Sequence, residues 1–151
     1  RCHSVLNALE HLSATASGRD WVLVHDAARP CVQPADIDRL IDTCMRNTDG
    51  GLLGMPVSDT MKRVDTKGNV TATVDRTGLW HALTPQMFRA GQLLEALRQG
   101  IRAGKTLTDE ASAMEAAGYA PRMVEGQRDN IKITVASDLE LAGYYLQRQH
   151  A

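Results

Sequence analysis

The sequence predicts an α/β fold in which a mainly parallel β-sheet is flanked by helices. Two short apolar runs, Trp21–Val24 and residues 51–57, have the length and composition of strands that are buried on both faces. Helical periodicity precedes the first run and fills the interval between the two, so helices and strands alternate along residues 4–57. This alternation is typical of α/β proteins with parallel strands.

The composition indicates a single domain over residues 1–151. The chain is 43% apolar and carries 17 Lys and Arg against 18 Asp and Glu, a formal charge of −1. This balance argues against a general polyanion-binding surface, which needs many unpaired cations, and no apolar run approaches the roughly 18 residues of a membrane span. The three cysteines lack C-x-x-C spacing, so we expect reduced thiols and a cytoplasmic protein.

Two helices are expected before residue 51. The first has apolar residues on one face from Val5 onward, with Ser4 as its N-cap, and runs to about residue 14. The second begins at Pro34, which suits the first turn of a helix, and its apolar positions recur every three or four residues up to Met45.

Residues 57–78 interrupt the alternation, and we expect them to form a protruding β-hairpin arm. They are polar and rich in Thr, and Lys67, Gly68 and Asn69 give a turn signal between two short alternating runs, 60–64 and 70–74. An isolated hairpin is only marginally stable in water. We therefore expect the arm to lie on another surface, such as a second subunit.

Strand character resumes at residues 79–83 and is expected to stop before Thr84. Phe88 then begins the apolar pattern of a helix that Gly104 ends, and residues 106–109 match a cap for a helix reaching residue 117. Two further strands are expected at residues 122–124 and 131–135, and a capping box that begins at Ser137 predicts the last helix.

Two groups of polar residues are candidates for chemistry. Asp26 and Arg29 follow the first apolar strand, and ligands of open parallel sheets bind beyond the carboxyl ends of the strands. A carboxylate there suits Mg²⁺ and an arginine suits phosphate, although the two side chains could equally pair in an ordinary surface turn. Asp129 and Lys132 could share one pocket edge, or form a solvated strand end.

Other catalytic motifs are not supported. Residues 100–106 read G-I-R-A-G-K-T, but a P-loop has four residues between its glycines and follows a strand, whereas this segment has three and follows a predicted helix. The histidines show no zinc-binding pair, and no G-x-S-x-G elbow is present. Cys44 is expected in the core, and Cys31, beside the Asp26 loop, is the one thiol retained as a candidate nucleophile.

Five strings of residues are distinctive when taken together: V-L-V-H-D-A-A-R-P at 22–30, P-V-S-D-T-M-K-R at 56–63, V-D-R-T-G-L-W-H-A-L-T-P-Q at 74–86, T-D-E-A-S-A at 108–113 and V-E-G-Q-R-D-N-I-K-I-T at 124–134. Their order and spacing resemble the 2-C-methyl-D-erythritol 4-phosphate cytidylyltransferase family. The resemblance implies a Rossmann-like sheet and a homodimer formed through the arm. It also implies transfer of a cytidylyl group from CTP to methylerythritol phosphate, which gives 4-diphosphocytidyl-2-C-methyl-D-erythritol and pyrophosphate in the non-mevalonate isoprenoid pathway.

The resemblance further implies roles for residues near the nucleotide. Asp26 would be the ligand of a Mg²⁺ cofactor. Ala27 and Arg29 would lie at the nucleotide and sugar-phosphate edges, and Ser4 matches a serine near the nucleotide.

For the acceptor substrate, the resemblance implies four more residues. Thr60 and Arg76, on the arm, would bind the methylerythritol phosphate of the partner subunit. Thr84 would be another substrate contact, and Lys132 would position that substrate. Two anions meet in this reaction, so Arg76 and Lys132 are expected to act catalytically as cations.

One departure from the family pattern leaves alternatives open. Nothing before Ser4 supplies the strand and Gly-rich basic loop expected to wrap the triphosphate of CTP, so we expect that an N-terminal segment is missing from the chain and that its CTP affinity is poor. The alternatives are a related nucleotidyltransferase that acts on another polyol or sugar phosphate, and an inactive dimerising remnant.

Overall fold

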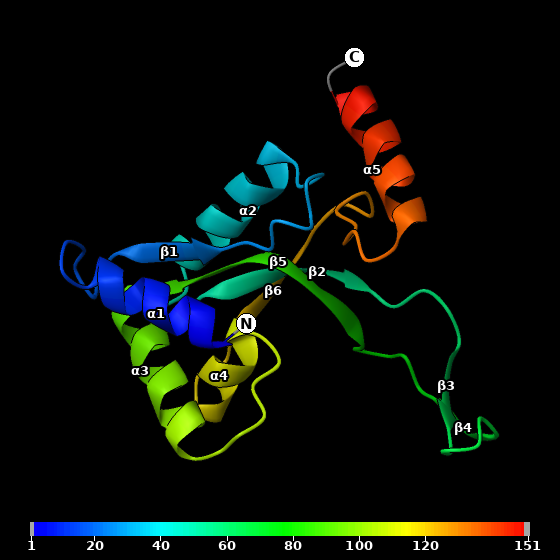
Figure 1. Cartoon of the computed structure of the whole chain (residues 1–151), viewed down its shortest axis with the longest axis horizontal. Helices are drawn as coiled ribbons and strands as arrows, with labels where there is room; N and C mark the ends of the chain where they lie inside the picture. The colour runs from blue at the N-terminus through cyan, green and yellow to red at the C-terminus, as the bar shows by residue number, and fades with distance from the viewer. Residues whose placement is uncertain (1, 150–151) are drawn as a thin grey trace.

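The computed structural model describes residues 2–149, which form a four-stranded sheet covered by helices and a separate two-stranded hairpin (Figure 1). The strand order is β1 (Trp21–Val24), β5 (Trp80–Arg89), β2 (Gly51–Pro56) and β6 (Arg122–Glu125). Strand β5 is antiparallel to both β1 and β2, whereas β2 and β6 are parallel. Three of these strands therefore point the same way, and the predicted α/β class is confirmed with a sheet that is mixed.

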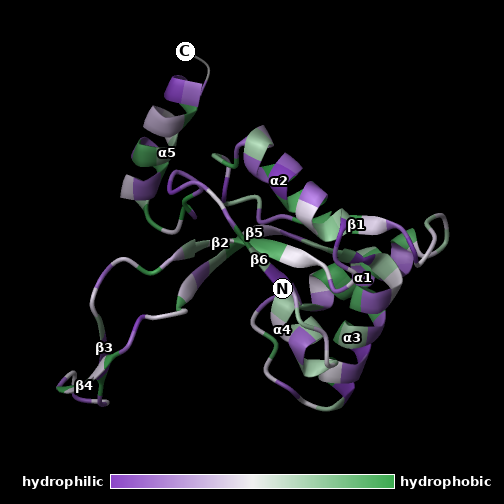
Figure 2. Cartoon of the chain, turned by 180° about the vertical axis from the view of Figure 1, so that it is seen from behind, coloured by the Kyte–Doolittle hydropathy of each residue, from purple (hydrophilic) through white to green (hydrophobic). Residues whose placement is uncertain are grey.

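Helices cover both faces of the sheet. Helix α2 (Pro34–Met45) lies on one face, and α1 (Cys2–Leu12), α3 (Ala90–Arg102) and α4 (Glu110–Ala116) lie on the other (Figure 1). Strand β5 serves both layers because its side chains alternate: Met87 belongs to the apolar cluster beneath α2, and Phe88 to the cluster with α3 and α4. Figure 2 shows that hydrophobic and hydrophilic residues alternate along these helices, as in amphipathic helices.

Strand β5 differs most from its prediction. It continues through Thr84 and Pro85 to Arg89, so ending the strand at residue 83 and assigning Phe88 to a helix were wrong. A proline lacks the N–H that a central strand needs, and the pairing with β2 is irregular between Leu52 and Gly54, opposite this point. Beyond it the ladder resumes, and Phe88 pairs with Val22 and is fully buried.

Three other local predictions are corrected. Strand β1 is not buried on both faces along its length, because it pairs only with β5 among the described strands and Leu23 is 39% exposed. Ser4 is not an N-cap, since α1 already includes Cys2 and His3. Residues 131–135 form neither a strand nor a helix.

The last helix, α5 (Ala136–Gln149), begins one residue before the predicted capping box. Its first turn is stabilised instead by Asp138, whose Oδ2 accepts hydrogen bonds from the main-chain N–H groups of Thr134 at 2.8 Å and Val135 at 3.1 Å. These bonds hold the pKa of Asp138 below its ordinary value. They also tie the start of α5 to the extended segment that precedes it.

The hairpin arm forms as predicted. Strands β3 (Met61–Val64) and β4 (Val70–Val74) pair with each other, and Gly68 takes a positive φ of 86° in the turn. The arm projects away from the sheet and helices (Figure 1).

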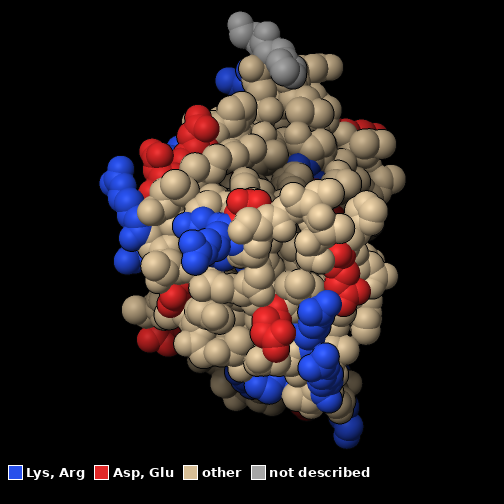
Figure 3. Space-filling view, turned by 90° about the vertical axis from the view of Figure 1, so that its left-hand side faces the viewer, with Lys and Arg blue, Asp and Glu red and all other residues tan. Residues whose placement is uncertain are grey.

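The surface carries interspersed charges. On the face seen in Figure 3, basic and acidic side chains lie side by side without forming a patch of one sign. Arg98 on α3 and Glu10 on α1, for example, are 2.9 Å apart. No helix within residues 2–149 is long and apolar enough to cross a membrane.

Candidate active site

The candidate site lies where the chain leaves β1 and crosses the middle of β5. The main-chain N–H of Asp26 donates a hydrogen bond of 3.1 Å to the hydroxyl of Thr84, and Nδ1 of His25 lies 3.0 Å from the same hydroxyl. Thr84 is only 3% exposed. The loop after β1 is therefore fixed to β5 through a side chain that the sequence predicted as a substrate contact.

The loop at residues 25–30 is also braced within itself. The N–H of Arg29 donates to the main-chain oxygen of Asp26 at 2.9 Å, and Nε2 of His25 lies 3.0 Å from the main-chain oxygen of Arg29. The N–H of Ala28 lies 3.3 Å from Oδ1 of Asp26. These contacts leave Oδ2 of Asp26 directed at a different segment, residues 129–133.

The central feature of the site is an ion pair between Asp26 and Lys132. Nζ of Lys132 lies 2.8 Å from Oδ2 of Asp26, and the two side chains are 45% and 21% exposed, respectively. At this exposure solvent screens the attraction, so the pair adds little to stability. The ion pair matters for the geometry of the site, because it places an ammonium group and a carboxylate together at a surface that a ligand can reach.

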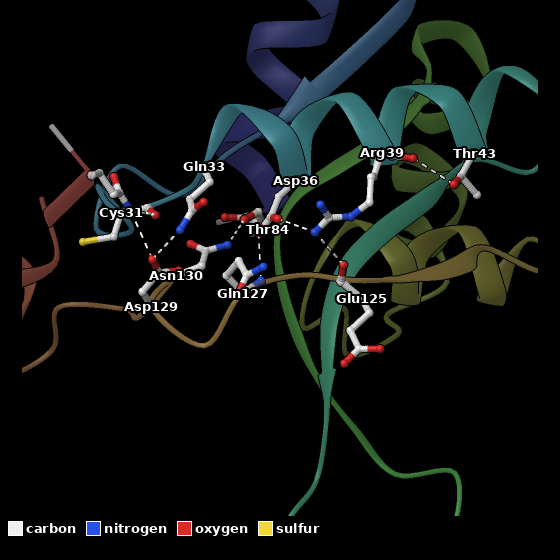
Figure 4. Close-up of polar contacts among 11 residues, drawn as sticks. Cys31, Gln33, Asp36, Arg39, Thr43, Thr84, Glu125, Gln127, Asp129 and Asn130 are labelled. Carbon is white, nitrogen blue, oxygen red and sulfur yellow. Dashed lines mark hydrogen bonds and ion pairs between the residues drawn. The ribbon is translucent and has the colours of Figure 1, made fainter. Parts of the chain in front are cut away.

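The segment that carries Lys132 is anchored by Asn130, which is only 1% exposed. The Asn130 side-chain amide donates to the main-chain oxygen of Thr84 at 2.9 Å, and Nη1 of Arg29 donates to the main-chain oxygen of Asn130 at 2.7 Å. Figure 4 shows Thr84 and Asn130 side by side beneath α2. The sequence analysis assigned no role to Asn130, although it lies in one of the strings that carry the resemblance.

A cavity of about 500 Å³ opens beside the ion pair. Three cationic side chains line it, those of Arg29, Arg128 and Lys132, together with one carboxylate, that of Asp138, so positive charge is in excess. Guanidinium and ammonium groups are the side chains that bind phosphate oxygens, the former as a bidentate fork and the latter as a point charge. The cavity is therefore suited to a small phosphorylated ligand.

The remaining predicted site residues are not part of this cluster. Ser4 is exposed on α1, and Thr60 and Arg76 are exposed on the arm, where Nη1 of Arg76 donates to the main-chain oxygen of Ser58. None of the three lines the cavity. Ala27 belongs to the braced loop, where the contact of 3.3 Å between the N–H of Ala28 and Oδ1 of Asp26 spans it.

No group of three His, Cys, Asp or Glu side chains among residues 2–149 is placed to hold a metal ion, and the environment of Cys31 does not activate its thiol. The thiol of Cys31 is buried, and burial together with the negative charge of Asp129 raises its pKa. Because a nucleophilic cysteine needs a lowered pKa, this argues against the role retained for Cys31.

A cationic cavity beside a carboxylate, at the end of a strand in an α/β sheet, is typical of α/β proteins that bind phosphorylated ligands. The model of one family of such proteins, "IspD: 2-C-methyl-D-erythritol 4-phosphate cytidylyltransferase", matches residues 1–148. The chain belongs to this family.

Individual relatives agree with that assignment. The chain is 60% identical over 151 residues to a 2-C-methyl-D-erythritol 4-phosphate cytidylyltransferase of Aeromonas hydrophila, covering 100% of this chain and 60% of that protein. The corresponding protein of Hahella chejuensis is 57% identical over 148 residues, covering 98% and 61%. This chain thus spans about three fifths of the length of these curated relatives.

Solved structures match the fold as well. The crystal structure of Francisella tularensis 2-C-methyl-D-erythritol 4-phosphate cytidylyltransferase superposes with a TM-score of 0.86 at 41% identity, covering 96% of this chain and 67% of that chain. A crystal structure of a 4-diphosphocytidyl-2C-methyl-D-erythritol synthase gives the same TM-score at 40% identity, covering 96% and 66%.

Proposed function

We propose that this chain carries the acceptor-substrate half of an active site that transfers a cytidylyl group from CTP to 2-C-methyl-D-erythritol 4-phosphate. The products are 4-diphosphocytidyl-2-C-methyl-D-erythritol and pyrophosphate, made in the cytoplasm for isoprenoid synthesis. The observation that carries the proposal is the contact of 2.8 Å between Lys132 and Asp26 at the mouth of a cavity lined by cations. Family membership adds the identity of the two substrates.

The chemistry requires positive charge more than it requires a base. A phosphate oxygen of the acceptor attacks the α-phosphorus of CTP and pyrophosphate leaves, so two anions must come together. Lys132 orients the acceptor phosphate and offsets the charge that develops on the reacting oxygens. Arg29, which also lines the cavity, holds a phosphate, and Thr84 keeps Asp26 in place through its hydroxyl.

The donor set of Asp26 suits Mg²⁺. This ion takes one or two carboxylates and completes its shell with water and substrate phosphates, and the carboxylate of Asp26 lies 2.8 Å from Lys132, which lines the cavity. When bound, the ion would neutralise charge on the triphosphate. Asp26 would hold it, and Lys132 would keep the carboxylate pointed at the cavity.

The site is completed by a second copy of the chain. On the arm, Met61, Val64 and Val70 are 38%, 54% and 63% exposed, and no described element of the same chain covers them. A homodimer buries these side chains and brings Thr60 and Arg76 of one subunit to the acceptor phosphate held by Lys132 of the other. Ser4 contributes on the nucleotide side.

Release of pyrophosphate from CTP tests the proposal. The assay is run with Mg²⁺, with and without methylerythritol phosphate, and with erythritol 4-phosphate as the matched control. It compares this chain with one extended at its N-terminus by the preceding residues of the Aeromonas relative. We expect release by the extended chain only with methylerythritol phosphate. Equal release with erythritol phosphate would favour the related nucleotidyltransferase, and no release with either would favour an inactive remnant.

A further inference from the structure

The place of Lys132 opposite Asp26 depends on the backbone around it, which is tied to Asp138 at Thr134 and Val135 and to the loop after β1 at Ile133. Residues 131–135 join no strand or helix, and the segment is held to the loop after β1 by the N–H of Ile133, which donates to the main-chain oxygen of Ala28 at 2.8 Å. A lysine has four rotatable side-chain bonds and is not locked by packing when it is 45% exposed. The geometry of the pair must therefore be set by the backbone that carries it.

Asn130 is the group that fixes this backbone. It lies two residues before Lys132, and its amide Nδ2 donates to the main-chain oxygen of Thr84 on β5. The orientation of the amide is determined, because a carbonyl only accepts hydrogen bonds and so must face the NH₂ group. Within residues 2–149 the other amide atom, Oδ1, has no hydrogen-bond partner, so the side chain is bonded to the fold through this one contact.

The main chain of Asn130 makes the complementary contact. Its carbonyl oxygen accepts the hydrogen bond from Nη1 of Arg29, on the loop that also carries Asp26. One residue therefore joins the sheet, the Asp26 loop and the Lys132 segment. Thr84, which belongs to the sheet, bonds to the other two, since its hydroxyl accepts from the N–H of Asp26 and its carbonyl accepts from Asn130.

We propose that Asn130 is a positioning residue: it acts through Lys132 by holding that ammonium group within reach of Asp26 and of the acceptor phosphate. The inference rests on the proposed function for its kinetic consequence, but the structural consequence can be measured without it. The side chain of Asn130 is 1% exposed and bonds to the main chain of Thr84, so it acts on the backbone that carries Lys132. Its removal shifts Lys132, and misplacement of such a group by about 1 Å can lower turnover about 100-fold.

A double-mutant cycle tests whether the effect passes through Lys132. In the extended, active protein we expect Asn130→Ala to lower kcat about 100-fold when Lys132 is present, and less than about 2-fold in a Lys132→Ala background. Independent effects would instead multiply. A loss of the same size in both backgrounds would overturn the proposal, because a merely structural role does not depend on Lys132.

Asn47→Ala is the matched control. Asn47 also donates from Nδ2 to a main-chain carbonyl, that of Gly50 at 3.3 Å, but it lies in the turn between α2 and β2 and does not line the cavity. We expect kcat to stay within about 2-fold of the unsubstituted protein. If Asn130→Ala does not fold, Asn130→Asp keeps the size of the side chain while placing a carboxylate against the carbonyl of Thr84, and the same cycle applies.

Amide hydrogen exchange supplies a readout that needs no activity. In the 151-residue chain, the N–H of Ile133 is protected by its bond to Ala28. We expect Asn130→Ala to increase exchange at Ile133 at least about 10-fold while the amides of β5 and α3 stay protected. Unchanged protection at Ile133 would overturn the positioning role even if cytidylyl transfer is demonstrated. Failure of the proposed function shows up separately, as absence of turnover in the unsubstituted extended protein.

Discussion

The loop at residues 25–30 and the arm at residues 57–78 are both polar segments that leave the ends of sheet strands, but they are bonded differently. The loop is joined to β5 through Thr84 and to residues 129–133 through Arg29 and Lys132. The hydrogen bonds of the arm are internal, as between Lys62 and Thr73 at 2.6 Å.

The carboxylates of the two segments differ in the same way, one having partners nearby in the sequence and the other a distant partner. In the arm, hydrogen bonds from Asn69, Lys67 and Gly68 lower the pKa of Asp65, and Asn69 has the largest effect. These partners all lie within four residues of Asp65 in the turn. Asp26 instead meets a lysine from a distant part of the chain. The loop is therefore preorganised by the fold, whereas the arm has a local shape and depends on another surface to fix its position.

The largest effect expected from this difference is on stability. Phe88 is fully buried, so Phe88→Ala should lower the free energy of unfolding by about 3–5 kcal/mol. Val70→Ala on the arm, at 63% exposure, should change it by less than about 0.5 kcal/mol in the monomer. Urea unfolding at low protein concentration measures both. A loss above about 1 kcal/mol at Val70 would show that the arm is already covered within one chain.

The next effect is on catalysis at the loop. Lys132→Ala removes the ammonium group from the cavity, and we expect kcat/KM of the extended protein to fall about 100- to 1,000-fold, or about 2.7–4 kcal/mol. Steady-state pyrophosphate release measures it. Lys105→Ala is the control, since Lys105 is exposed, does not line the cavity and donates from Nζ to the carbonyl of Ala116. Near-normal turnover of Lys132→Ala would remove Lys132 from the mechanism.

The next smaller effect is a partial return of activity when two inactive variants are mixed, and it tests whether the arm completes the site of another subunit. Asp26→Ala and Arg76→Ala proteins should each be inactive, but co-refolding them in equal amounts should restore about one quarter of the sites, because half of the dimers are mixed and each has one intact site. Arg63→Ala, also on the arm, is the control and should retain activity by itself. Mixed dimers, isolated with two affinity tags, that remain inactive would contradict a shared site.

The smallest expected effect is on the pH dependence of stability, and it comes from the buried thiol of Cys44. Burial raises the pKa of Cys44 from 9.0 to about 11. The unfolded chain therefore loses this proton before the folded one does, and stability falls as pH rises from 9 toward 11. Relative to Cys44→Ala, the unsubstituted chain should lose about 1.4 kcal/mol of unfolding free energy between pH 8 and 10. Urea titrations at both pH values measure the difference, and a constant difference would contradict the raised pKa.

Much of the local structure could be predicted from the sequence, because those signals come from neighbouring residues. Strand β1 and helix α2 have the predicted boundaries, since a short apolar run and a Pro-initiated amphipathic pattern each specify one element. The arm was predicted by the same kind of signal, with Gly68 in its turn. Family membership was predicted from the five strings and is confirmed over residues 1–148.

Errors occurred where pairing partners decide the outcome. Pro85 led to the prediction that the strand ends before it, but pairing with β1 and β2 extends β5 to Arg89. Residues 131–135 read as a strand by composition, but among residues 2–149 they have no neighbouring strand in register. Ser4 matches an N-cap by residue type, although α1 starts before it.

The sequence by itself determined most of the helices and strands, the polar arm and the family, because periodicity, turn residues and ordered motifs are local properties of the chain. Only the tertiary structure decided that β5 runs against its neighbours and that Thr84 and Asn130 join the Asp26 loop to Lys132. A hydrogen bond between residues distant in the chain depends on how strands are ordered in the sheet. That order cannot be read from the residues that neighbour Thr84 or Asn130 in the sequence.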